Sequence, residues 1–485
     1  SGRAPRMIVL FRNIIGSNTT LKHGAWLCIA SGLGLSLLGL YAIDLGAHDP
    51  PSGPLPVTIE GVVFKQILFL CAGLMAATLA ALPHYKIVRS LAWPSMIVVL
   101  GLLAFLLIPF VPTSIVRPRN GARAWIDLGP VDLQPAELAK IAFVLVAAHT
   151  LRYRQTHRKF LGLVLYGLLA GVPMGLILLQ PDMGTVLLFV PVLFAMLFVS
   201  GAKTKHLAIV VVCAMLAAPA AYPLLKPHQK KRIEGLLLIM KDPRRGANDI
   251  NYQMVTAKTL AGSGEVLGQS DGRARSLIRF NRLPERHNDM IFPIIVCRFG
   301  LFGGVLVGAL YGVWFLGAYL TAAFSKDPFA RLLVVGFMTF IAGQAFVNIA
   351  MTIGILPVIG VSLPFLSYGG SSMLPSWLLT GLVVSVAMRR QATFAKPAFE
   401  YDPIPYDPDD PHLPQKIMPQ VGSESGRTAA DAASRPFPSA RVIAPRTVPM
   451  KVSAASRRSS LRCWASASAI VADALPALGS NQRCA

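Results

Sequence analysis

The ten residues Leu283-Pro284-Glu285-Arg286-His287-Asn288-Asp289-Met290-Ile291-Phe292 mark the point where a long charged loop becomes an apolar helix. A carboxylate at such a junction, that of Asp289, is expected at the boundary between water and lipid, within reach of a lipid-borne substrate and of soluble sugars. Ionisable groups at the edge of a membrane are functional candidates by default. Two further polar segments, 120–140 and 348–372, supply cations and glycine-rich backbone. Together the three segments predict one extracytoplasmic site.

The composition is that of an integral membrane protein. The 485 residues are 54% hydrophobic and only 14% charged, which is too apolar for an ordinary soluble globule. The net charge of +23 lies mainly in short loops between apolar runs and in the C-terminal part of the chain, a distribution that favours a topology signal over nucleic-acid binding. The six cysteines show neither a disulfide framework nor a zinc spacing. We therefore expect membrane lipid, and no nucleic acid, around this chain.

Ten apolar runs approach the length of about 20 residues that a spanning helix needs. They lie near 25–44, 63–82, 92–112, 136–151, 160–178, 184–200, 207–225, 291–324, 329–352 and 371–388. The sequence predicts an all-α polytopic membrane protein with ten transmembrane helices within 25–390, the first of them retained. The eighth run is too long for one crossing. Either it tilts, or residues 291–299 stand above the bilayer and the span begins near Leu301.

Loop charge predicts the orientation, because short cytoplasmic loops are enriched in Lys and Arg. Basic residues precede the first run and follow every even-numbered one. Both termini, including the N-terminal segment 1–24, are therefore expected in the cytoplasm. The long loop 226–290, between helices seven and eight, then faces outward and shows little helical pattern. Residues 391–485, rich in Pro, Ser and Ala, predict a disordered cytoplasmic tail.

Several candidate residues have a structural interpretation as well as a chemical one. Asp289 precedes the apolar helix by two residues, where a carboxylate can also cap free amides. Glu137 and Lys140 share a helix face, as a local ion pair or as ligands. Asp182 follows a proline and fits an N-cap at least as well as a ligand. Arg123 could clamp a phosphate bidentately.

Segment 353–370 carries no charge yet contains several prolines and glycines. Such backbone is tolerated at membrane depth only where it packs against protein or lines a cavity. It leads through Ser367-Tyr368-Gly369-Gly370-Ser371 into the tenth helix. Amides at a glycine-rich helix start can seat an anion, although a plain turn is the commoner use of such a sequence.

Taken together, these segments resemble the SEDS family of shape, elongation, division and sporulation proteins (RodA, FtsW, SpoVE). The resemblance covers about residues 25–390. The matching pieces occur in family order: Asn120-Gly121-Ala122-Arg123 with Trp125, Gln134-Pro135 with Glu137 and Lys140, Gln180-Pro181-Asp182 with Gly184-Thr185, Leu283-Pro284-Glu285-Arg286-His287 with Asp289, and Asn348 through Pro357, Pro364 and Ser367-Tyr368-Gly369-Gly370-Ser371. Arg286 and the run Gly262-Ser263-Gly264 resemble the elongation (RodA) branch more closely.

The resemblance implies a peptidoglycan glycosyltransferase that polymerises lipid II at the outer face of the bacterial cytoplasmic membrane, for elongation and rod shape. It implies a class B penicillin-binding protein (transpeptidase) and the elongation or division machinery as partners. The family's essential loop aspartate corresponds to Asp289. Other matched positions are expected to bind substrate: Arg123, Glu137, Lys140, Asp182, Arg232, Tyr252, Gln253, Glu285, His287, Asn348, Ser367, Gly369, Gly370 and Ser371.

The implied chemistry is physically coherent. Asp289 would remove the proton of the acceptor GlcNAc 4-hydroxyl as it attacks the anomeric carbon of the donor MurNAc. Undecaprenyl pyrophosphate is a good leaving group, so no second carboxyl acting as acid is demanded. Positive charge on the departing oxygens is needed, and Arg123, Lys140 and Arg232 could supply it. No cofactor is evident; a divalent cation, Mg²⁺ or Mn²⁺, could assist the pyrophosphate, but no carboxylate cluster demands one.

The sequence departs from the family pattern at four positions. Ala124 stands where members usually have Arg, Asn288 replaces a common Thr, and Cys297 and Arg298 replace a usual pair of Glu. We hypothesise that Arg298 pairs with Glu137 or Asp182 instead. These departures leave reduced activity or a shifted substrate open.

Three alternatives to elongation-specific synthesis follow from the same features. The first is the same activity in the division septum. The second is a carrier for the lipid-linked precursor, although a carrier should place ionisable groups near the bilayer midplane. The third is a weakly active or non-catalytic scaffold for the transpeptidase.

Overall fold

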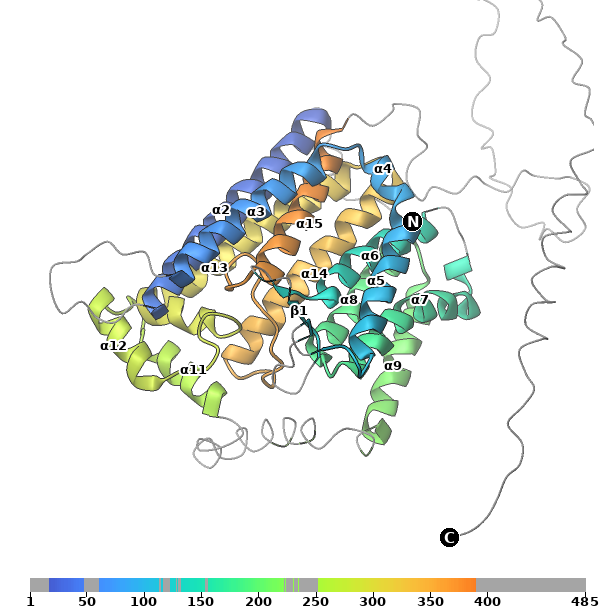
Figure 1. Ribbon diagram of the computed structural model, residues 1–485. Helices are drawn as coiled ribbons and strands as arrows, with labels where there is room; N and C mark the ends of the chain where they lie inside the picture. The colour runs from blue at the N-terminus through green and yellow to red at the C-terminus, as the bar shows by residue number, and fades with distance from the viewer. Residues whose placement is uncertain are drawn as a thin grey trace, which may run out of the picture. The chain divides into compact units, whose positions relative to one another are not determined.

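The computed structural model describes residues 17–47, 61–112, 115–116, 123–127, 129, 132–152, 156–221, 223, 230, 234 and 252–389. All of them belong to one compact unit, Ser1–Ile404. The expected tail 391–485 and most of the loop before Tyr252 lie outside the described residues. Within the described part the chain is a bundle of α-helices with one two-stranded sheet (Figure 1).

Each of the ten predicted apolar runs corresponds to a helix among the described residues. These helices are α2 (Ser17–Ala47), α3 (Gly61–Ala81), α5 (Ala92–Leu107), α6 (Pro135–Leu151), α7 (Phe160–Leu179), α8 (Met183–Val199), α9 (Thr204–Ala221), α13 (Ile291–Phe324), α14 (Pro328–Thr352) and α15 (Gly370–Met388). Six of them are long and apolar enough to cross a membrane: α2, α3, α7, α13, α14 and α15. The chain is therefore a multi-pass membrane protein.

Short elements occupy the connections. They are α4 (Tyr85–Ser90), η1 (Thr156–Arg158), α11 (Tyr252–Gly262), α12 (Asp271–Asn281), and the antiparallel strands β1 (Ile126–Asp127) and β2 (Asp132–Leu133). The expectation of little helix in the loop before α13 is wrong for its second half, which contains α11 and α12. Both lie at the end of the bundle where α13 begins (Figure 1).

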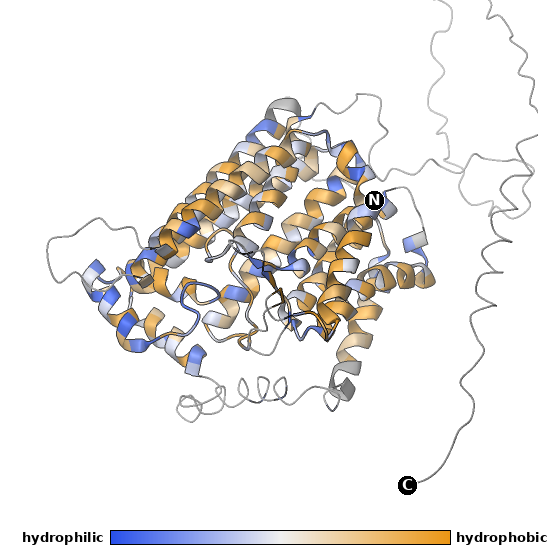
Figure 2. Ribbon diagram, viewed as in Figure 1, coloured by the Kyte–Doolittle hydropathy of each residue, from blue (hydrophilic) through white to orange (hydrophobic). Residues whose placement is uncertain are grey.

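The helices of the bundle consist mainly of hydrophobic residues (Figure 2). Large apolar side chains on α3, α5 and α7 are exposed, among them Met75, Ile97 and Leu161. A soluble monomer rarely exposes so much contiguous apolar surface, whereas a lipid-facing bundle must. Inside the bundle, small residues let helices approach closely. A Cβ on Gly381 of α15 would lie only 2.2 Å from the Ala77 carbonyl oxygen of α3.

α13 is broken at Gly300, whose φ of 63° and ψ of −155° are not helical. The turn at 264–269 replaces the hydrogen bonds lost there, because Leu301 N donates to Glu265 O and Gln269 N donates to Cys297 O. A Cβ on Gly268 would lie 2.2 Å from Arg298 O, so only glycine permits this approach. The break lies one residue before Leu301, the position at which one of the two alternatives places the start of the span.

Candidate functional site

The loop that carries Asp289 is anchored through its backbone. Asn348 Nδ2 on α14 donates to Asp289 O at 2.8 Å and to Val361 O at 2.7 Å. Asn348 is fully buried and Asp289 is only 8% exposed. The N-cap of α13 is Met290, whose own side chain makes no capping hydrogen bond. Asp289 directly precedes this N-cap, so its structural interpretation as a helix cap and its chemical one both stay open.

A second anchor comes from the segment that enters α15. Ser367 Oγ donates to Asn288 O at 2.6 Å and accepts from Leu363 N at 2.7 Å. The Tyr368 amide donates to His287 O at 2.8 Å. The loop before α13 is thus bound on one side by α14 and on the other by the 361–369 segment. The sequence predicted that these segments meet, and they do.

Gly360 lies directly beside the Asp289 carboxylate. It has a φ of +80°, and a Cβ built on it would lie 3.9 Å from Asp289 Oδ2, with no other heavy atom of the described residues within 4 Å apart from those of its two chain neighbours. On the other side of this segment, Gly184 of α8 packs so closely that its Cβ would lie 2.8 Å from a methyl carbon of Val361. The start of α8 and the Asp289 loop therefore contact the same short segment.

The starts of α6 and α8 form a polar cluster. Lys140 Nζ and Glu137 Oε1 are 2.7 Å apart, and both residues are buried. Asp182 caps α8 by accepting from Thr185 N and Thr185 Oγ1, and it also accepts from Gln134 Nε2 at 3.0 Å. The structural interpretations of Glu137 and Lys140 as an ion pair and of Asp182 as an N-cap are both realised.

Arg123 and Glu285 lie nearer the surface. The Arg123 guanidinium donates to Pro109 O at 3.3 Å and to Val111 O at 3.0 Å. Glu285 is exposed and accepts from Asn288 Nδ2 at 2.6 Å. His287 is half-buried, and Arg286 Nε lies 3.3 Å from its Nε2. Burial, together with the Arg286 charge, lowers the pKa of His287 from 6.5 to about 4, so its ring is neutral at pH 7.

The remaining expected site residues divide into three groups. Tyr252 and Gln253 begin α11, and the Tyr252 hydroxyl donates to Asn281 O at 3.1 Å. Gly369 is the N-cap of α15 with a φ of 117°, and Gly370 and Ser371 form its first turn. Arg232 lies outside the described residues. The structure brings none of these into a contact that identifies a ligand.

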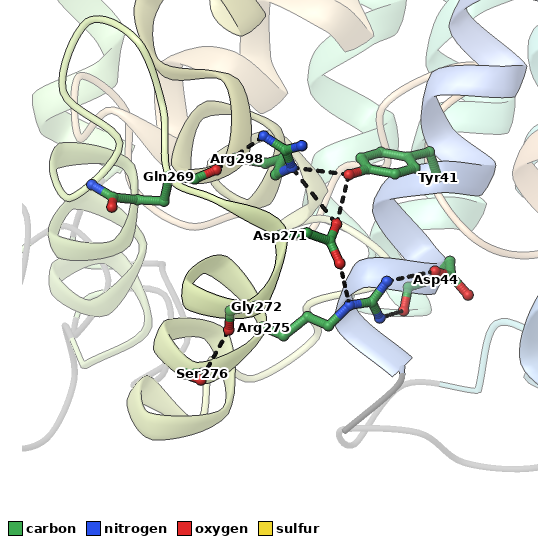
Figure 3. A network of polar contacts seen from close by, with 8 residues as sticks. All are labelled: Tyr41, Asp44, Gln269, Asp271, Gly272, Arg275, Ser276 and Arg298. Atoms are coloured by element: carbon green, nitrogen blue, oxygen red, sulfur yellow. Dashed lines mark hydrogen bonds and ion pairs between the residues drawn. The ribbon is translucent and has the colours of Figure 1, made fainter. Parts of the chain in front are cut away.

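Arg298 does not pair with Glu137 or Asp182, so that hypothesis is wrong. Its Nε donates to the Tyr41 hydroxyl at 2.9 Å and lies 3.7 Å from Asp271 Oδ1 (Figure 3). Its Nη1 donates to Gln269 O. Arg298 is turned toward α2 and α12 because the helix break at Gly300 presents it to the 264–269 turn.

The same network joins α12 to the end of α2. Arg275 Nη2 lies 2.8 Å from Asp44 Oδ2, and Arg275 Nε lies 2.9 Å from Asp271 Oδ2 (Figure 3). Burial alone would raise the pKa of Asp271, but hydrogen bonds from Arg275 and Tyr41 and the charges of Arg275 and Arg298 bring it below its ordinary value. Sequence reasoning missed this network because its members lie some 230 positions apart.

Sequence reasoning also missed Gln66 on α3, which is fully buried. Its Nε2 donates to Ser367 O at 3.2 Å, and its Oε1 accepts from Gly369 N at 3.0 Å. The available signal was an amide side chain that follows Lys65 in a largely apolar run. Such a residue is expected to find a specific buried partner.

The fold and site define a class: a multi-pass helical membrane protein whose polar site gathers the starts of α6, α8, α13 and α15 with the end of α14. The family of FtsW, RodA and SpoVE, described as "Cell cycle protein", matches residues 57–392, and the chain belongs to this family.

Individual relatives agree with the family assignment. The chain is 32% identical over 333 residues to "Probable peptidoglycan glycosyltransferase FtsW" of Geobacter metallireducens, a match that covers 68% of this chain and 85% of the relative. It is 31% identical over 382 residues to the protein of the same name from Mycobacterium tuberculosis, covering 76% of this chain and 70% of the relative. These names lean toward the division branch, so the expected closeness to the RodA branch is not confirmed.

Solved structures show the same fold. A chain of a peptidoglycan synthase complex that coordinates polymerization and crosslinking is 29% identical, with a TM-score of 0.61 over 75% of this chain and 97% of that one. The rod shape determining protein RodA of Thermus thermophilus is 27% identical, with a TM-score of 0.53 over 75% of this chain and 96% of that one.

Proposed function

We propose that this chain is a peptidoglycan glycosyltransferase that polymerises lipid II, with Asp289 as the general base. The observation that carries the proposal is the anchoring of the backbone at Asn288 and Asp289 by Ser367 and Asn348, in a chain of this family. The curated relatives bear this activity in their names. A base held from two sides suits a reaction in which one proton is removed at a defined position.

The proposed reaction forms one glycosidic bond and breaks one bond to phosphate. Asp289 accepts the proton of the GlcNAc 4-hydroxyl while that oxygen attacks the MurNAc anomeric carbon. The electron pair of the breaking bond leaves with undecaprenyl pyrophosphate. The space beside Gly360 adjoins the Asp289 carboxylate, and we assign it to the acceptor sugar.

Cations on the same end of the bundle are proposed to receive the departing diphosphate. A guanidinium has five N–H donors. Two hydrogen bonds from Arg123 go to backbone carbonyls, so donors remain for phosphate. Lys140 is bonded to Glu137, so its charge acts on the site as part of a pair. The start of α15 is proposed to complete the set, together with Arg232, whose position lies outside the described residues, and a divalent cation brought by the pyrophosphate would act beside them.

The proposed topology has all ten helices crossing the bacterial cytoplasmic membrane. α5, α8 and α9 are apolar but shorter than the six long spans. The basic loops after the second, fourth, sixth, eighth and tenth apolar runs favour cytoplasmic termini. This orientation places the Asp289 loop outside. Lipid II on the outer leaflet would then reach the site directly.

A class B penicillin-binding protein is the proposed partner, supported by the likeness to a synthase complex that couples polymerization to crosslinking. For the cellular process, the relatives' names support septal synthesis, whereas Arg286 and the 262–264 run support elongation. Complementation of conditional FtsW and RodA strains separates the two, because rescue of only one strain identifies the branch.

The activity is tested with the purified chain and lipid II in proteoliposomes, with Mg²⁺, with Mn²⁺ and with chelator. Glycan polymer that is lost in Asp289→Asn supports the proposal. The matched control is Asp327→Asn, because Asp327 caps α14 at the opposite end and Asn retains that cap. Translocation of lipid II without polymer would identify a carrier, and neither activity would identify a scaffold.

A further inference from the structure

Gln66 is a buried amide on α3, a helix long and apolar enough to span the membrane, and its side chain bonds to the backbone of Ser367 and Gly369. Its side chain is 0% exposed, and it lies on the face of α3 that packs against α15. Both ends of the amide are used, one as donor to Ser367 O and one as acceptor from Gly369 N. A buried polar side chain with both groups satisfied rigidifies the backbone it contacts.

The two bonded backbone groups flank Tyr368, whose own amide points to the other side and donates to His287 O. The Ser367 hydroxyl points the same way and donates to Asn288 O. The 367–369 segment therefore lies between Gln66 and the loop of Asp289. Gln66 binds the backbone of Ser367 and Gly369, while Ser367 Oγ and the Tyr368 amide bind the loop of Asp289.

Gly369 gives a reason why a side chain is needed there. It is the N-cap of α15 and adopts a φ of 117°. Because glycine has no side chain, Gly369 itself cannot cap the helix. Helix starts leave several amides without helical partners. Gln66 Oε1 accepts a hydrogen bond from the Gly369 amide at this junction. This bond stabilises the observed backbone conformation at the start of α15 relative to other conformations.

We propose that Gln66 is a positioning residue for Asp289, acting through Ser367, Tyr368 and Gly369; this inference rests on the proposed function. The amide holds the 367–369 segment in the one register in which Ser367 Oγ meets Asn288 O and Tyr368 N meets His287 O. Gln66 contacts neither sugar nor diphosphate.

The test uses Gln66→Met in the full chain, because Met has a similar length and no amide. The matched control is Ser385→Ala. Ser385 is buried on α15 and its hydroxyl donates to Pro83 O, so it ties α15 to the chain after α3 at the other end of the same helix pair. Each variant removes buried hydrogen bonding between the α3 region and the α15 region. Only Gln66→Met removes hydrogen bonds that lie beside the Asp289 loop.

The first readout is hydrogen exchange, which does not depend on activity. Gln66→Met is expected to speed exchange of the amides in 363–369 and 283–292, and Ser385→Ala is expected to leave both unchanged. Unchanged exchange in 283–292 with Gln66→Met overturns the positioning role whether or not the chain is a glycosyltransferase.

The second readout is polymerisation of lipid II. Gln66→Met is expected to lower kcat by about tenfold to a hundredfold, while KM changes little, because misplacing a catalytic group by about 1 Å costs that much. Gln66→Glu in its protonated form keeps an acceptor for the Gly369 amide and a donor for Ser367 O, and is expected to retain more of kcat than Gln66→Met. Equal kcat in wild type and Gln66→Met overturns the inference, whereas a wild type without polymer overturns the proposed function instead.

Discussion

Asn348 and Asp289 are joined through the Asn348 amide and the Asp289 backbone carbonyl, at 2.8 Å, rather than through the carboxylate. The same amide binds Val361 O at 2.7 Å. Asn348 therefore links the end of α14 to two segments of the site and leaves the Asp289 carboxylate outside this link.

Asn348→Asp should abolish polymerisation and destabilise the protein. The new carboxylate would face two carbonyl oxygens in a fully buried position, with no N–H to donate. Loss of such buried hydrogen bonds costs about 1–3 kcal/mol each. Melting temperature and lipid II turnover measure the effect. Thr339→Val, on the same helix and bonded only to Val335 O, is the control, and an active, stable Asn348→Asp would contradict the prediction.

The buried pair of Glu137 and Lys140 predicts a non-additive pair of substitutions. Removing one partner leaves a buried charge and should cost about 3–5 kcal/mol, whereas replacing both with apolar residues should cost much less. Lys140→Met should be the worse single change, because it leaves Glu137 near Asp182 without its cation. Thermal unfolding of Glu137→Leu, Lys140→Met and the double variant measures the coupling. Additive shifts would contradict the pairing.

Arg298→Glu should loosen α12 rather than restore a family feature. The new carboxylate would lie near Asp271, which is now 3.7 Å from the Arg298 guanidinium, so an attraction would become a repulsion. The substitution would also remove the hydrogen bonds from Arg298 to the Tyr41 hydroxyl and to Gln269 O. Limited proteolysis in the 264–282 region is expected to speed up. Unchanged or slower cleavage in Arg298→Glu would contradict this account of the network.

The helices could be predicted because apolar run length is a local property. Each of the ten runs corresponds to a helix, whereas the break at Gly300 was not predicted, although the eighth run was recognised as too long for one crossing. The meeting of the Asp289 loop with Asn348 and Ser367 was predicted from the polar and glycine-rich character of these segments on one side of the membrane, not from periodicity. Periodicity tells which residues are buried but not which partner they meet.

The partner of Arg298 could not be predicted for the same reason. It depends on how the 264–269 turn packs on the broken helix and how α12 docks on α2, and both are long-range contacts. Gln66 was missed because one amide in an apolar run indicates a buried partner without naming it. The turn glycines at 264 and 268 were visible, but their close approach to α13 was not.

Gly360→Ala should reduce activity more than stability. A φ of +80° costs an L-residue roughly 1–2 kcal/mol. The added methyl would also stand 3.9 Å from Asp289 Oδ2, in the space we assign to the acceptor sugar. Gly354→Ala is a partial control, because Gly354 has a similar φ of +82° but faces Lys258 instead. We expect a much larger loss of lipid II turnover for Gly360→Ala, and equal losses would contradict its role beside the base.

His287 predicts a pH dependence of stability. Its pKa is about 4 in the folded protein, against an ordinary value of 6.5, because burial and the Arg286 charge disfavour the imidazolium. Between pH 6.5 and 4 the unfolded chain therefore binds more protons at this residue, so the free energy of unfolding falls as the pH falls through this window. Above pH 6.5 the ring is neutral in both states and contributes no slope. His287→Gln should flatten the decline in melting temperature between pH 6.5 and 4.5, since Gln does not titrate. An unchanged slope would mean that other groups carry the acid sensitivity, and a steeper slope would reverse the sign assigned to His287.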